Sequence, residues 1–167
     1  SKSMTVTVPL AVDLEVITDP NDATVNIGYY ILGADGTVNA FGTVPALPKA
    51  TAVTSDLGAV ALEIESLAGV VTGYEVLLQN GAIQFWNGTE MSMSSAVYNS
   101  ANHPLVVDFV KATSTIYSTY FVLDELGNVF SFGPDPTNNN PNAFDGLIGN
   151  YGFFDLEAGF LNSVPNE

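Results

Sequence analysis

The sequence predicts an almost entirely β-sheet protein, and three observations support this fold class. Hydrophobic residues make up 47% of the 167-residue chain and fall into short runs rich in Val, Ile, Phe, Tyr and Thr, the residues that strands favour. Gly, Pro, Asn and Asp interrupt these runs, as turns require. One hairpin motif also recurs along the chain. A chain of this length forms one domain with a sizeable core.

The first copy of the hairpin, GYYILGADGTVNAFG, spans residues 28–42. Two more copies follow, GYEVLLQNGAIQFWN at 73–87 and TYFVLDELGNVFSFG at 119–133. Each copy has a tyrosine near its start, a glycine seven residues later and an aromatic residue twelve residues later. These positions are Tyr29, Gly36 and Phe41; Tyr74, Gly81 and Trp86; and Tyr120, Gly127 and Phe132. The constant spacing predicts three equivalent units.

The turn residues explain why each unit is a hairpin. Asp35-Gly36 and Asn80-Gly81 supply the positive φ of tight hairpin turns, and the tyrosine and the later aromatic can meet across the paired strands. The third copy keeps Gly127 but changes the residues around it. We therefore assign the hairpin aromatics a structural role, with an exposed sugar-binding platform as the alternative.

A strand-like run precedes each hairpin, at 11–17, 60–66 and 105–111, and a fourth run lies at 153–160. We predict a single domain with repeats at about 10–54, 55–100 and 101–146, followed by a closing or donated strand within 147–167. The polar, Pro- and Asn-containing segments 18–26, 44–58, 90–104 and 133–146 are interpreted as linkers.

The hairpins resemble the glycine and aromatic repeats of bacterial secreted and cell-surface β-propeller proteins, in which a hairpin of the type GYWLV..DGGVFAFG recurs from blade to blade. The resemblance covers about half of the chain and implies blade-like antiparallel units that bind or support other molecules. Propellers close with about four to eight blades, so three repeats depart from the pattern. A β-trefoil-like or prism-like threefold fold, a ring completed by several chains, and an open stack remain alternatives.

The charge of the chain limits the kinds of molecule it can bind. The chain has 18 acidic residues, three lysines, no arginine and a formal net charge of -15. Nucleic acid and anionic membranes need clustered basic residues, so we expect neither as a partner. Open edges of an incomplete ring would favour pairing with other subunits. We therefore expect a homo-oligomer that associates near residues 4–16 or 153–160, more strongly as salt screens the charge.

Few residues suit catalysis. The chain has no cysteine, and its one histidine, His103, lies in a polar linker, which argues against a zinc site and a Ser-His-Asp triad. The carboxylate pairs Glu63 with Glu65 and Asp124 with Glu125 suit glycoside hydrolysis by identity alone, but strand alternation places the first pair on a solvent face. We expect no enzyme activity and no resident cofactor. Calcium is the ion best suited to the segments 19–22 and 135–145.

Two functions fit these observations. The first is a structural subunit that decorates or builds a virion, a phage tail or an extracellular fibre, located outside the cell or on a virion surface. The alternative is a carbohydrate- or peptide-recognition module that uses exposed aromatics such as Trp86 and Tyr98.

Overall fold

The fold was analysed in a computed structural model, which describes residues 9–67, 69–94, 96, 104–113, 118–135 and 140–150. Every regular element of these residues is a β-strand, so the predicted all-β class is confirmed. The strands are β1 (Ala11–Asp19), β2 (Asp22–Gly33), β3 (Val38–Gly42), β4 (Ala59–Leu67), β5 (Val70–Leu78), β6 (Ile83–Trp86), β7 (Met91–Met93), β8 (Val106–Thr113), β9 (Ser118–Asp124), β10 (Asn128–Asp135) and β11 (Asn140–Asn150). No membrane-spanning helix occurs in this part of the chain.

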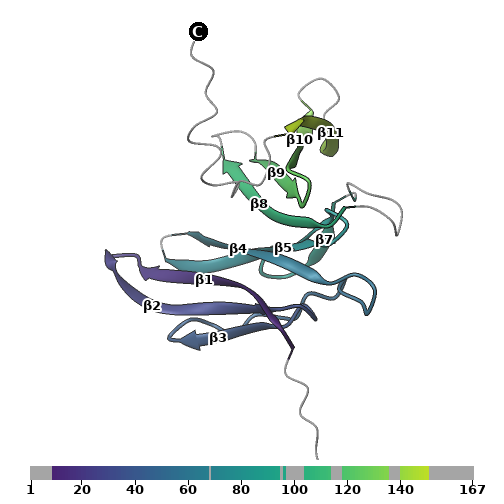
Figure 1. The fold of residues 1–167 in the computed structure, drawn as a ribbon. Coiled ribbons are helices and arrows are strands. Elements are labelled where there is room, and N and C mark those ends of the chain that lie inside the picture. Colours follow the sequence, from purple (N-terminus) through teal and green to yellow (C-terminus); the bar gives the residue numbers. More distant parts are fainter. Residues whose placement is uncertain are drawn as a thin grey trace, which may run out of the picture.

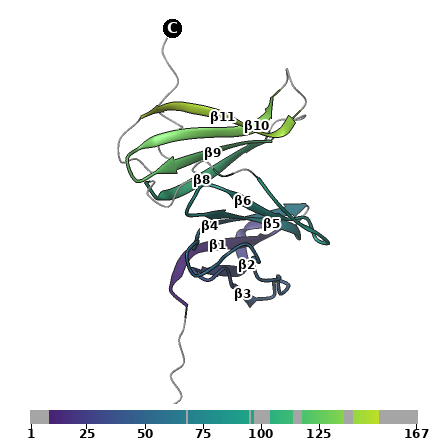
Figure 2. The ribbon, with the colours of Figure 1, turned by 90° about the vertical axis from the view of Figure 1, so that its right-hand side faces the viewer.

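The strands form three antiparallel sheets that follow one another along the sequence. The first sheet has the order β1-β2-β3, the second β4-β5-β6-β7 and the third β8-β9-β10-β11. The sheets lie in layers, with the second between the other two (Figures 1 and 2). Contacts between layers run mainly through their leading strands, β1 with β4 and β4 with β8. We call the contact of the first and second sheets the first interface, and that of the second and third sheets the second interface.

The three hairpins share one register. The tyrosine faces the aromatic residue twelve positions later in every sheet: Tyr29 with Phe41, Tyr74 with Trp86, and Tyr120 with Phe132. On the leading strands, the partners of these tyrosines are Val16, Ile64 and Lys111. The register of each leading strand also shifts at the same place, between Ala11 and Asp13, Ala59 and Ala61, and Val106 and Asp108. Residues of one sheet can therefore be matched to those of the next.

The turns of the hairpins follow the sequence as well. Gly36, Gly81 and Gly127 have φ angles of 82°, 80° and 82°, a region that glycine enters without strain. Their N–H groups donate to the carbonyls of Gly33, Leu78 and Asp124, three residues earlier. In the third turn, the buried carboxylate of Asp124 also accepts hydrogen bonds from the N–H groups of Leu126 and Asn128. This carboxylate replaces the Asp-Gly and Asn-Gly chemistry of the other two turns.

The core lies between the layers because each sheet presents alternate residues to its neighbour. In the first interface, Tyr30 and Leu32 pack against Leu62, Tyr74 and Val76. In the second, one cluster joins Ala61, Leu77 and Ile83 to Val106, Phe109 and Val122. Each interface also contains a backbone hydrogen bond at the start of the leading strand, from Ala59 N–H to Ala34 O and from Val106 N–H to Gln79 O.

Three segments interpreted as linkers contain strand residues. Residues 18–26 hold the end of β1 and the start of β2, joined by a tight turn, and β7 falls within residues 90–104. The segment 133–146 contains the end of β10 and most of β11, so β11 crosses the boundary predicted at residue 146. The Asn and Pro content of these segments suggested loops, but pairing with a neighbouring strand overrides such local preferences. Residues 153–160 lie outside the described residues, and the repeat limits stay predictions.

Candidate functional site

A group of polar side chains lies in the second interface. Glu75, on β5, is 2% exposed. Its Oε1 atom accepts hydrogen bonds from Lys111 Nζ at 2.7 Å and from Tyr120 Oη at 2.6 Å. Lys111 Nζ, on β8, also donates to Oε1 of Glu65, near the end of β4 in the sheet that holds Glu75. We call these four residues the Glu75 network.

Two aromatic rings border the Glu75 network. Lys111 Nζ lies 5.5 Å from the centroid of the Tyr120 ring, and Phe85 meets that ring edge-on at a centroid distance of 5.6 Å. Both contacts reduce access of water to the charged groups. Oε2 of Glu75 is buried and accepts no hydrogen bond from the described residues. Leaving a buried carboxylate oxygen unpaired costs free energy, so the network is not optimised for stability alone.

Burial and hydrogen bonding together determine the ionisation of the network. It raises the pKa of Glu75, although the hydrogen bonds from Lys111 and Tyr120 act in the opposite direction. Burial alone would lower the pKa of Lys111, but its bonds to Glu65 and Glu75 outweigh that effect and raise it. The pKa of Tyr120 is raised by burial and by the bond to Glu75. The arrangement can therefore hold a proton on Glu75 at a higher pH than an exposed carboxyl can.

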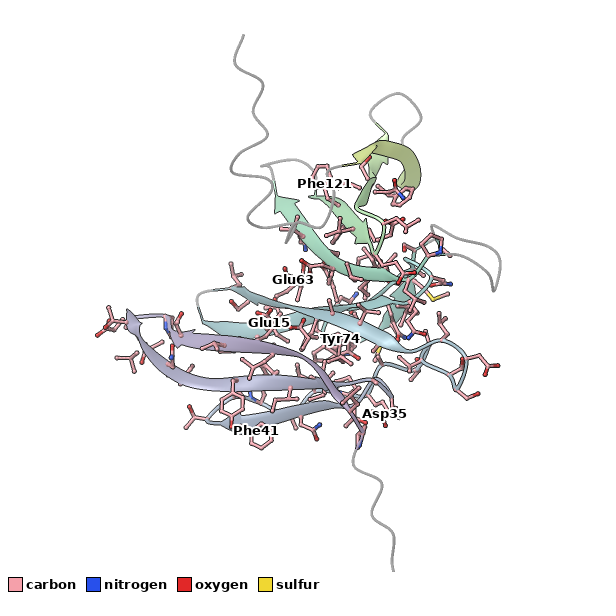
Figure 3. The ribbon with its side chains drawn as sticks, in the orientation of Figure 1. Glu15, Asp35, Phe41, Glu63, Tyr74 and Phe121 are labelled. Carbon is pink, nitrogen blue, oxygen red and sulfur yellow. The ribbon has the colours of Figure 1, made fainter. Side chains whose placement is uncertain are left out.

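A second polar feature lies beside the leading strands. A cavity of about 270 Å³ is bordered by four carboxylate residues, Asp13, Glu15, Glu63 and Asp108. Asp13 Oδ2 accepts the N–H of Leu62 on the next sheet at 2.7 Å, which links the first two leading strands. The carboxylates of Glu15 and Glu63 lie on neighbouring strands (Figure 3). Within the described part of the chain, no three His, Asp or Glu side chains are placed to hold a metal ion.

The third feature is a face of the first sheet that no described layer covers. It carries Leu14, Val16, Tyr29, Ile31 and Phe41, and we call it the outer face. Tyr29 and Phe41 stack with ring centroids 4.9 Å apart and ring planes 12° apart. Phe41 lies on the side of the sheet away from the second layer (Figure 3). Exposed apolar surface of this kind typically marks a contact with another molecule.

The carboxylates considered for hydrolysis have other partners. Glu65 belongs to the Glu75 network and Glu63 borders the cavity. Asp124 organises the third hairpin turn, and Glu125 Oε1 accepts the N–H of Leu105. The side chain of Glu65 is 40% exposed and also contacts Lys111 of the third sheet, so it is only partly open to solvent.

The aromatics considered for recognition differ in their surroundings. Trp86 is half-buried and packs against the first core, with its ring 5.6 Å from that of Tyr74. Tyr98 lies outside the described residues, as does His103. The more exposed aromatic pair is Tyr29 with Phe41, which were predicted as structural positions of the repeat.

The acidic segments considered for calcium are only partly described. Asp19 accepts hydrogen bonds from the N–H and Nδ2 of Asn21, and Asp22 accepts them from the N–H and hydroxyl of Thr24. Both carboxylates thus stabilise the turn between β1 and β2, as short acidic side chains commonly do. The side chains of 135–145 lie outside the described residues.

Sequence reasoning missed the Glu75 network. Its signal is a charged residue in an apolar run, Glu75 within GYEVLL, combined with Lys111 at the end of LVVDFVK. Pairing them requires knowing that β5 and β8 belong to adjacent layers. No protein-family model, curated protein or solved structure matches the chain, so the class defined here is that of an all-β protein of layered antiparallel sheets.

Proposed function

We propose that this protein is a non-enzymatic structural subunit that associates with other protein subunits in a larger assembly. The observation that carries the proposal is the outer face of the first sheet. Leu14 is 51% exposed, Val16 47% and Phe41 43%. A surface that holds apolar side chains side by side in an otherwise acidic protein favours burial against another protein.

The composition of the interior supports a structural rather than a catalytic role. The layers are joined by apolar clusters and by hydrogen bonds between backbones. The carboxylates of the Glu75 network are held by Lys111 and Tyr120. Such groups orient one layer on the next. The setting we propose is a larger assembly such as a virion, a phage tail or an extracellular fibre.

The charge of the protein makes the proposal testable. A net charge of -15 opposes contact between like subunits, and salt screens this repulsion over about 8 Å at physiological ionic strength. We expect the weight-average mass in sedimentation velocity to rise with salt at constant protein concentration. A protein that stays monomeric at every salt and protein concentration contradicts a self-assembling subunit and favours a recognition module.

A further inference from the structure

The outer face of the first sheet matches faces that are buried elsewhere in the same molecule. In the shared register, Tyr29 and Ile31 correspond to Tyr74 and Val76 of the second sheet. Tyr74 and Val76 are both fully buried against the first sheet. Val122, which corresponds to Ile31 in the third sheet, is fully buried against the second. The first sheet thus exposes the kind of face that this fold otherwise packs on another sheet.

The outer face is also free of charge. Its side chains form two rows of cross-strand neighbours. One row holds Leu14 and Ile31 and continues to Asn39 on β3, and the next row holds Val16, Tyr29 and Phe41. None of these side chains ionises near neutral pH, although the chain carries 18 acidic residues. Two such faces can therefore meet without placing like charges in the contact, which would otherwise destabilise it.

The opposite end of the stack is less suited to receive this face. There the third sheet has a small cluster centred on Leu123 and Val129, each 5% exposed. The centre of that surface is therefore little exposed in a single chain. On the outer face, by contrast, Tyr29 is 38% exposed and Leu14 is 51% exposed. The open face of one copy thus finds its best match in the same open face of another copy.

We propose that two copies of this chain associate through the outer faces of their first sheets, in a two-fold symmetric dimer. This inference rests on the proposed function and names the partner and the contact surface. Symmetric dimers bury the same patch on both subunits. Sheets packed face to face lie about 10 Å apart with interdigitated side chains, so the Tyr29–Phe41 pair of each copy fills the centre of the contact.

The first experiment compares two double variants. Y29S/F41S removes the stacked aromatics from the outer face, whereas L67S/V70S removes two more exposed apolar side chains where β4 meets β5, 74% and 65% exposed. We expect Y29S/F41S to weaken dimerisation by about tenfold or more in sedimentation equilibrium, because central aromatics dominate such contacts. L67S/V70S should leave it unchanged. Thermal unfolding of both variants checks that their folds are intact.

The second experiment distinguishes a same-face dimer from a head-to-tail one. Wild-type chain is mixed with a mass-tagged Y29S/F41S chain and examined by native mass spectrometry. The proposal predicts wild-type dimers with few mixed dimers, because the variant offers no matching face. Abundant mixed dimers indicate a head-to-tail contact and overturn the proposal, while the proposed structural function stands. Full association of Y29S/F41S alone shows that the contact does not use the outer face, which also overturns the proposal. A wild-type protein that is monomeric throughout overturns both.

Discussion

The first and second interfaces share one register but differ in chemistry at one pair of positions. In the first interface, the pair is Tyr30 on β2 of the first sheet and Ile64 on β4 of the second sheet. In the second, the corresponding residues are Glu75 and Lys111, which are bonded to each other. The first tyrosine of the hairpin motif has a different hydrogen-bond acceptor in each interface. Tyr74 Oη donates to the carbonyl of Pro48, whereas Tyr120 Oη donates to Glu75.

This difference shows that a layered fold tolerates a charge pair when both positions change together. Glu75 without Lys111 would be an unpaired charge between two sheets, at a cost of several kcal/mol, whereas Lys111 without Glu75 would still pair with Glu65. A buried ion pair does not by itself stabilise a protein more than apolar residues of similar size. We expect its role to be orientation of the third sheet on the second, because hydrogen bonds are directional and apolar contacts are not.

The largest expected effect follows removal of the cation from the second interface. Lys111→Met leaves Glu75 buried without its charged partner, so we expect a loss of about 3 kcal/mol in the free energy of unfolding. Urea denaturation at neutral pH measures this loss. The control is Lys49→Met in the exposed pair with Asp35, whose side chains are 51% and 44% exposed. This change should cost less than about 1 kcal/mol.

A second variant tests whether the loss in Lys111→Met comes from the unpaired charge of Glu75 or from altered packing. In Lys111→Met/Glu75→Leu, both charges are replaced by apolar side chains, as in the first interface. We expect most of the stability lost in Lys111→Met to return, because no buried charge remains. If the double variant is less stable than the single one, the network contributes net stability and our account of its role is wrong.

The next effect compares two tyrosines at the same repeat position. Tyr120→Phe removes a hydrogen bond to a carboxylate and should cost about 2 kcal/mol, whereas Tyr74→Phe removes one to a carbonyl and should cost about 1 kcal/mol. Denaturant unfolding of both variants provides the comparison. Equal losses would mean that the charge of Glu75 adds nothing to the bond with Tyr120.

Much of the fold could be predicted because it depends on local signals. The spacing of tyrosine, glycine and aromatic residue predicts the hairpins, and the structure pairs Tyr29 with Phe41 and Tyr74 with Trp86 in that register. Strand composition likewise predicts the leading strands β1, β4 and β8. Turn residues determine register over a few positions, so these features can be predicted without knowledge of the tertiary structure.

The features that remained hidden depend on packing between layers. Glu75 and Lys111 are 36 residues apart in sequence, and nothing local indicates that they meet. The polar residues 133–135 and 140–146 form strand because a neighbouring strand offers its hydrogen bonds. The exposure of Tyr29 was equally hidden, since the same motif residue is buried in the second sheet. Burial is a property of the neighbouring layer, which the motif alone does not specify.

The smallest change at neutral pH is expected for Glu75→Gln, and its dependence on pH is the informative quantity. Because burial raises the pKa of Glu75 in the folded protein, the folded state holds a proton there that the unfolded state has lost. Stability from this group is therefore present below the ordinary glutamate pKa of about 4.3. It declines as pH rises toward the higher folded value.

The difference in unfolding free energy, wild type minus Glu75→Gln, should decrease over that interval. Glu90→Gln, at an exposed position, is the matched control, and its difference should stay nearly constant. A difference for Glu75→Gln that instead grows with pH would show that Lys111 and Tyr120 outweigh burial and keep Glu75 ionised.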